Sequence, residues 1–168
     1  MEATYNDTVV LGCGNILFGD DGFGSRVAEH LQNSESLPEN ACVIDATTRV
    51  REILFDLILS EHKPRRIIVV DAVDVSKKPG EVFRIGLDEL PRNKIDDFTL
   101  HEMPTCNLLG ELRDLCGVEV VIVAGQVDRI PETVSPGLSD ALAESVKIAA
   151  EEVLAACWQM ANLAAEIV

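Results

Sequence analysis

The sequence predicts a single α/β domain in three layers, with a mostly parallel, twisted β-sheet flanked by helices on both faces. The chain has 168 residues, a length that suits one domain with a substantial core. Short apolar runs rich in Val and Ile alternate along it with amphipathic segments of helical period. This alternation is typical of strands joined by right-handed helical crossovers. We therefore treat residues 1–168 as one domain.

Several segments have the composition of strands. The run Ile67–Ala72 is rich in β-branched residues, as expected of a central parallel strand buried on both faces. The run Glu81–Ile85 instead alternates between apolar and polar residues after a turn at 76–80, which favours a short edge strand. The predicted strands are Thr8–Cys13, Cys42–Asp45, Ile67–Ala72, Glu81–Ile85 and Val118–Val127.

Other segments have the helical period. Phe23, Val27 and Leu31 recur at i, i+4 and i+8 and define one apolar face. Pro104 suits the first turn of a helix. The last helix is rich in alanine and longer than one core face, so its far end is where an oligomer contact would be sought. The predicted helices are Gly22–Gln32, Val50–Glu61, a helix from Pro104 that stops at Gly117, and Gly137–Val168.

The charge balance restricts the possible partners. There are 29 acidic and 14 basic residues, which give a formal charge of −15. Such a surface repels phosphate backbones, so nucleic acid is not expected as a partner. No apolar run reaches membrane-spanning length and the first residues do not form a signal segment, so we expect a cytoplasmic protein without membrane association. The five cysteines are scattered, which favours reduced thiols over disulfides or a zinc site.

Acidic residues follow three of the predicted strands. Asp20 and Asp21 come after the first strand, Asp45 ends the second, and Asp71 and Asp74 follow the apolar run of the third. In open α/β sheets, ligands bind beyond the carboxyl ends of the strands. This edge of the sheet is therefore the predicted site.

An imidazole joins these acids from the irregular loop 87–104. Asp21, Asp71 and His101 would form a metal site of two carboxylates and one imidazole. Mixed oxygen and nitrogen ligands suit zinc, nickel, cobalt or manganese, and three protein ligands leave positions open for water or substrate. Such a metal polarises a carbonyl or generates hydroxide. The alternative is that the acids only stabilise helix N-termini.

Two other kinds of site are weaker interpretations. Gly12-Cys13-Gly14 follows a strand, as in a dinucleotide site, but the next glycine, Gly19, comes later than in the Rossmann fingerprint. Asp20 and Asp21 would also place negative charge where a pyrophosphate binds, so no organic cofactor is expected. Cys106 lies five residues from His101 and is a candidate thiol nucleophile, although packing within its helix explains it better.

The segment from Leu11 to Gly24 resembles the N-terminal signature of the [NiFe]-hydrogenase maturation endopeptidases, peptidase family M52. In that family a strand opens into Gly-x-Gly-Asn-x-Leu, followed by Asp-Asp/Glu-Gly and a helix. Ile68–Ala72 resembles the family's second acidic strand end, and Leu100-His101-Glu102 resembles its histidine loop. The order and spacing of all three agree, and the resemblance covers essentially the whole chain.

The resemblance implies an endopeptidase that removes a C-terminal peptide from the precursor of a [NiFe]-hydrogenase large subunit after nickel has been inserted. The family's metal-contacting and catalytic positions correspond to Asp21, Asp71 and His101, which would engage nickel supplied by the substrate. Asn15 and Asp45 fall at positions implied to bind substrate. The family's Asp-Gly-Gly-Thr loop reads Asp45-Ala46-Thr47-Thr48 here and lacks both glycines.

The stretches Glu102–Thr105 and Asn107–Leu109 most resemble the group that serves archaeal deazaflavin-reducing hydrogenases. Two other classes of function stay open: a non-catalytic nickel checkpoint or scaffold that holds the large subunit, and a nucleotide-binding protein. The oligomeric state is open, and Asp20 and Asp74 are candidate proton acceptors by position.

Overall fold

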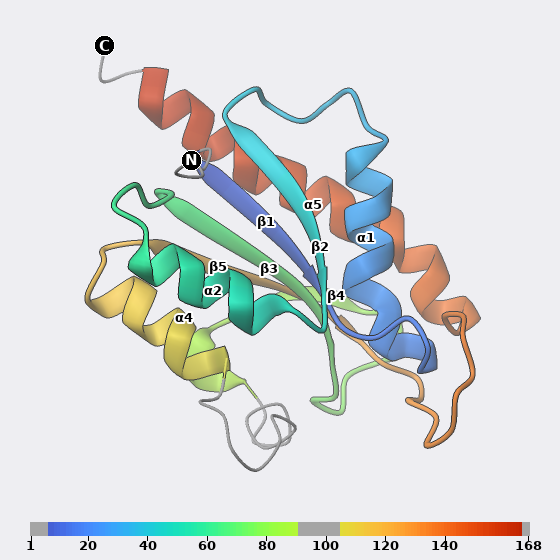
Figure 1. Ribbon diagram of the computed structural model, residues 1–168. Helices are drawn as coiled ribbons and strands as arrows, with labels where there is room; N and C mark the ends of the chain where they lie inside the picture. Colours follow the sequence, from blue (N-terminus) through green and yellow to red (C-terminus); the bar gives the residue numbers. More distant parts are fainter. Residues whose placement is uncertain (1–6, 91–104, 166–168) are drawn as a thin grey trace.

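The computed structural model describes residues 7–90 and 105–165, which build a five-stranded sheet with the strand order β2-β1-β3-β5-β4 (Figure 1). β1 pairs with β2 and β3, and β3 pairs with β5, all in parallel. β4 is antiparallel to β5 at the edge, as predicted for an edge strand. The strands are β1 Thr8–Cys13, β2 Ala41–Thr47, β3 Arg66–Val73, β4 Val82–Ile85 and β5 Glu119–Gln126.

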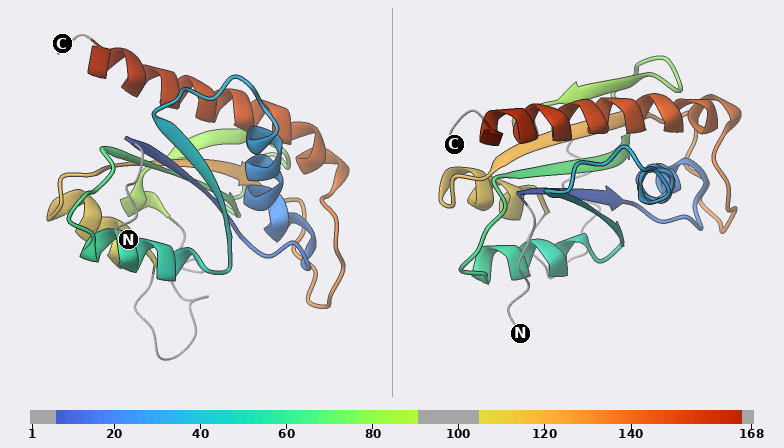
Figure 2. Two further views of the ribbon diagram at one scale, coloured as in Figure 1. Left: turned by 45° about the horizontal axis from the view of Figure 1, so that its top comes forward. Right: turned by 90° about the horizontal axis from the view of Figure 1, so that it is seen from above.

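Helices cover both faces of the sheet, so the predicted three-layer α/β class is confirmed (Figure 2). Residues of α1 and α5 pack into one apolar cluster with the sheet, and residues of α2 and α4 pack into the other. There are two short 3₁₀ helices: η1 precedes α1, and η2 follows β4. The helices are η1 Gly19–Gly22, α1 Phe23–Gln32, α2 Val50–Leu59, η2 Leu87–Glu89, α4 Thr105–Asp114 and α5 Asp140–Ala165.

The position of β3 in the middle of the sheet explains its apolar composition. Ile68 and Val70 belong to the cluster under α1 and α5, whereas Ile67 and Val69 belong to the cluster under α2 and α4. Successive side chains of a strand point to opposite faces, so a strand covered on both faces is apolar at every position. This burial is why the run showed no alternation.

Helix ends differ from the predicted ones for local backbone reasons. Ser60 has φ −64° and ψ 139°, an extended conformation, so α2 ends before the predicted Glu61. Gly137 has φ +108°, so α5 begins at Asp140 rather than at Gly137. The predicted first residue of helix one, Gly22, instead ends the 3₁₀ turn η1. Pro104 lies outside the described residues.

The start of α1 packs unusually close to the sheet. A Cβ atom added at Gly24 would overlap the carbonyl oxygens of Val70 and Cys13, so only glycine fits there. This contact holds η1 and the start of α1 over the carboxyl ends of β1 and β3. Within the ranges that the structure describes, no helix is long and apolar enough to cross a membrane.

Candidate active site at the carboxyl edge of the sheet

The chain turns sharply at Gly14, where β1 ends. Gly14 has φ +117°, a conformation that side chains disfavour. A Cβ atom at this position would overlap the backbone oxygen of Asp21 and lie 3.7 Å from Oδ1 of Asp71. Asp21 and Asp71 therefore both lie next to Gly14, although 50 residues separate them in the sequence. The sheet edge brings together two of the three predicted ligands.

Hydrogen bonds within the first loop hold Asp21 in place. The backbone N–H of Asn15 donates to Asp21 Oδ2 at 2.9 Å, and Asn15 Oδ1 accepts from the backbone N–H of Leu17 at 3.0 Å. Asp21 is partly buried rather than fully exposed. Asn15 thus shapes the turn that carries Asp21, and its predicted contact with substrate stays a prediction.

Asp71 ends the apolar part of β3 beside the first turn of α4. Its Oδ1 accepts a hydrogen bond from the backbone N–H of Ala72 at 2.8 Å, which orients the carboxylate. Burial raises the pKa of the Cys106 thiol, and the negative charge of Asp71 raises it further. Cys106 is therefore a neutral thiol near pH 7, which argues against a nucleophilic role.

Comparison with known proteins shows the family to which the chain belongs. The family model described as hydrogenase maturation protease, HycI, matches residues 25–156. The chain belongs to the hydrogenase maturation protease family. It is therefore a peptidase, that is, a hydrolase with a protein substrate. The matched residues begin just after the glycine-rich loop and include Asp71.

Individual members of the maturation protease family match along almost their whole length. A putative hydrogenase maturation protease of Methanocaldococcus jannaschii is 40% identical over 150 residues, covering 88% of this chain and 94% of the relative. The coenzyme F420 hydrogenase subunit delta of Methanothermobacter thermautotrophicus is 31% identical, covering 88% and 92%. The solved structure of the hydrogenase maturating endopeptidase HybD from E. coli superimposes with a TM-score of 0.69 at 28% identity, covering 91% and 93%.

In this maturation protease, a β-bulge at the end of β2 stands where the resemblance implied a loop with two glycines. Gly12 pairs with Asp45 and Cys13 pairs with Thr47, so the buried Ala46 is an extra residue. Thr47 has φ +49°, and its carbonyl oxygen accepts a hydrogen bond from the backbone N–H of Gly14 at 3.1 Å. The bulge leaves Asp45 exposed. The loop is thus built without either glycine, at the cost of a strained threonine.

Replacing Thr47 by glycine is expected to leave the free energy of unfolding unchanged or raise it by up to about 1.5 kcal/mol. Relief of the left-handed conformation of a β-branched residue raises the free energy of unfolding by roughly 1–2 kcal/mol. The flexibility of glycine in the unfolded chain lowers it by about 0.5–1 kcal/mol. The matched control is Thr48→Gly, at an exposed neighbour whose φ is not positive. Urea denaturation should show a loss of about 0.5–1 kcal/mol for that control. Equal losses in both variants would contradict the strain at Thr47.

The two acids proposed as proton acceptors have other partners in the protease. Asp20 is fully buried, and its carboxylate accepts hydrogen bonds from the backbone N–H groups of Asp128, Arg129 and Ser139 and from the Ser139 hydroxyl. Its role is structural, which sequence position alone did not indicate. Hydrogen bonds from the Gln126 side chain and the Ser76 backbone hold the pKa of Asp74 below its usual value and make it a weaker base.

The third predicted ligand, His101, lies outside the described residues. Among the residues that are described, no group of three or more His, Cys, Asp and Glu side chains is arranged to hold a metal ion. A site made by Asp21, Asp71 and His101 therefore stays a prediction. Of its two described members, Asp21 lies next to Gly14 through its backbone and Asp71 through its carboxylate.

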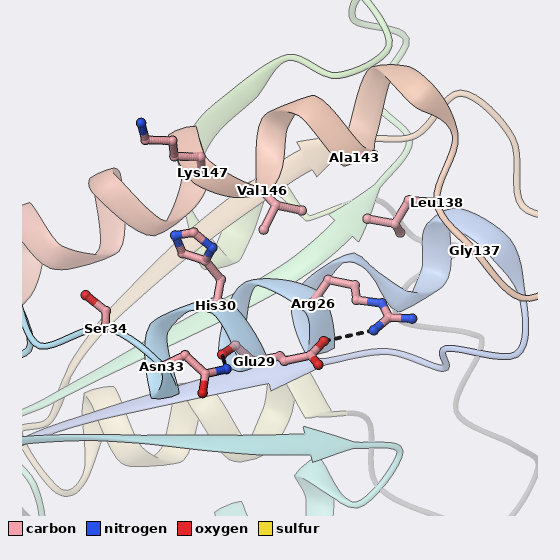
Figure 3. Close-up of a pocket in the computed structure, with 10 residues that line it drawn as sticks. All are labelled: Arg26, Glu29, His30, Asn33, Ser34, Gly137, Leu138, Ala143, Val146 and Lys147. Carbon is pink, nitrogen blue, oxygen red and sulfur yellow. Dashed lines mark hydrogen bonds and ion pairs between the residues drawn. The ribbon is translucent and has the colours of Figure 1, made fainter.

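A cavity of about 780 Å³ lies elsewhere, between α1 and α5 (Figure 3). Arg26 and Glu29 form an ion pair of 2.8 Å on its α1 side, and Lys147 comes from α5. Of the predicted site residues that the structure describes, Asn15, Asp21, Asp45 and Asp71, none lines it. This cavity is not the predicted site.

Proposed function

We propose that this maturation protease removes the C-terminal peptide from the nickel-loaded precursor of a [NiFe]-hydrogenase large subunit. The observation that carries the proposal is the meeting of Asp21 and Asp71 at Gly14, at the carboxyl edge of the sheet, in a chain of this family. Ligands bind at this edge in open α/β folds.

The chemistry of the residues suits a divalent ion that arrives with the substrate. Two carboxylates and the imidazole of His101 are ligands that nickel accepts. Asn15 and Ala72 donate backbone hydrogen bonds that orient the two carboxylates before the substrate binds. The ion would polarise the scissile carbonyl or lower the pKa of an attacking water. An empty precursor lacks the ion that would bridge enzyme and substrate, so cleavage reports that nickel insertion is complete.

The hydrogenase whose precursor is cleaved belongs to the group that reduces the deazaflavin coenzyme F420. The relative named coenzyme F420 hydrogenase subunit delta supports this assignment, as do the stretches 102–105 and 107–109. The reaction takes place in the cytoplasm, needs no organic cofactor and involves neither membrane nor nucleic acid. The formal charge of −15 supports the exclusion of nucleic acid.

The deciding experiment compares nickel-loaded with nickel-free precursor of an F420-reducing hydrogenase large subunit. Incubation with the purified protease should shorten the loaded precursor by its C-terminal peptide and leave the nickel-free precursor intact, as read by mass spectrometry. Adding a nickel chelator after loading should stop cleavage. Equal cleavage of both precursors would refute the role of nickel.

A second candidate role, in addition to the peptidase activity, is that of a checkpoint or scaffold that holds the large subunit. The name of the F420 hydrogenase relative, which describes it as a subunit, favours lasting association. The same incubation tests this role: a scaffold would stay bound to the large subunit after mixing, whereas a protease without this role would release the shortened subunit.

A further inference from the structure

Large apolar side chains are exposed on two loops beside the candidate site. Ile16 and Leu17, each 45% exposed, lie between β1 and η1. Ile130, 43% exposed, and Val134, 64% exposed, lie between β5 and α5. We call these residues the docking patch. Exposed apolar side chains that gather in one place mark surfaces that bind other proteins.

Backbone hydrogen bonds join the two loops into one surface. The N–H of Ser135 donates to the carbonyl of Leu17 at 2.8 Å, and the N–H of Gly19 donates to the carbonyl of Ser135 at 2.9 Å. Figures 1 and 2 show the two loops side by side at the carboxyl edge of the sheet. The buried carboxylate of Asp20 ties the same loops together from below. The docking patch is therefore built on a fixed backbone.

The docking patch is continuous with the candidate site. Leu17 donates its backbone N–H to Asn15 Oδ1, and Asn15 donates its own to Asp21 Oδ2. A partner seated on Ile16 and Leu17 would thus lie next to the carboxylate that is proposed to contact nickel. Other exposed large apolar residues of the described chain, such as Leu59 and Leu115, precede β3 and β5 and lie at the opposite edge of the sheet.

We propose that the docking patch binds the folded body of the large-subunit precursor while its C-terminal peptide lies across Asp21 and Asp71. This inference rests on the proposed function. Continuity with the site identifies the occupant, because a second copy of this chain seated there would block the approach of a protein substrate to Asp21. Apolar contact also suits a protein of charge −15, since it needs no basic partner surface.

The test compares Leu17→Ser and Val134→Ser with the matched controls Leu115→Ser and Leu59→Ser. Leu115 is 80% exposed and Leu59 is 68% exposed, so all four changes remove an exposed apolar side chain. Cleavage of nickel-loaded precursor should show KM raised about tenfold in each patch variant, with kcat little changed. The controls should keep the wild-type KM. Thermal denaturation of every variant checks that the fold is intact.

Binding of the loaded precursor, measured separately by calorimetry, distinguishes failure of this inference from failure of the proposed function. Wild-type cleavage with equal KM in patch and control variants would overturn the docking patch alone. Absence of cleavage, together with binding that only the patch variants weaken, would overturn the proposed cleavage of this precursor and support the patch. Self-association of the wild type that Leu17→Ser abolishes without changing KM would make the patch a contact between copies and overturn the inference.

Discussion

Replacing Asp21 or Asp71 by asparagine is expected to slow cleavage of nickel-loaded precursor by at least about 100-fold. The backbone of Asp21 and the carboxylate of Asp71 both lie next to Gly14, and the proposed chemistry uses the charge of the two side chains either to contact the ion or to move a proton. Loss of a group in either role typically costs about 10²-fold or more. Asparagine keeps one oxygen that can accept the backbone hydrogen bonds from Asn15 and Ala72. The variants should therefore fold normally.

Asp74→Asn is the matched control for these variants. Asp74 follows the same strand, but its carboxylate accepts hydrogen bonds from the side chain of Gln126, at the end of β5, and from the backbone N–H of Ser76, in the loop after β3. Its cleavage rate should stay within a few-fold of wild type, and single-turnover mass spectrometry measures all three variants together. The same assay extends to His101→Ala. Full activity of Asp21→Asn and Asp71→Asn would remove these residues from the reaction.

The fold could be predicted because burial leaves a direct trace in the sequence. Ile67–Val70 is apolar at every position because helices cover both faces of β3, and the Phe23, Val27 and Leu31 spacing matches the buried face of α1. Element ends were less predictable, since they depend on single backbone conformations. The extended backbone of Ser60 ends α2, and the positive φ of Gly137 delays the start of α5, although composition alone predicts longer helices.

The site was predictable only in part, because neighbouring residues of one type can have opposite roles. Asp20 and Asp21 are adjacent and chemically identical in the sequence. The structure buries the first and brings the second beside Asp71. The difference is set by hydrogen-bond donors that are more than 100 residues away in the sequence, on Asp128, Arg129 and Ser139. The left-handed backbone of Thr47 was equally hidden, since a threonine predicts no such conformation.

Replacing the buried Asp20 by alanine is expected to lower the free energy of unfolding by at least about 3 kcal/mol. Oδ1 accepts the N–H of Ser139 at 2.7 Å, and Oδ2 accepts the N–H groups of Asp128 at 2.8 Å and Arg129 at 3.3 Å and the Ser139 hydroxyl at 3.0 Å. Alanine leaves these donors without their acceptor, and each unsatisfied buried group costs about 1–3 kcal/mol. For a domain of this size the melting temperature should fall by roughly 6–12 °C.

Glu132→Ala is the control, because Glu132 is exposed on the same loop and its loss should change stability by no more than about 0.5 kcal/mol. Asp20→Asn adds a sharper comparison. Both carboxylate oxygens of Asp20 accept hydrogen bonds, so in either orientation the amide NH₂ would face a donor. Asparagine should therefore be destabilising despite its matching shape. If Asp20→Asn proved as stable as wild type, the four donors could not be what holds the two loops together, and the fixed position of Asp21 would need another cause.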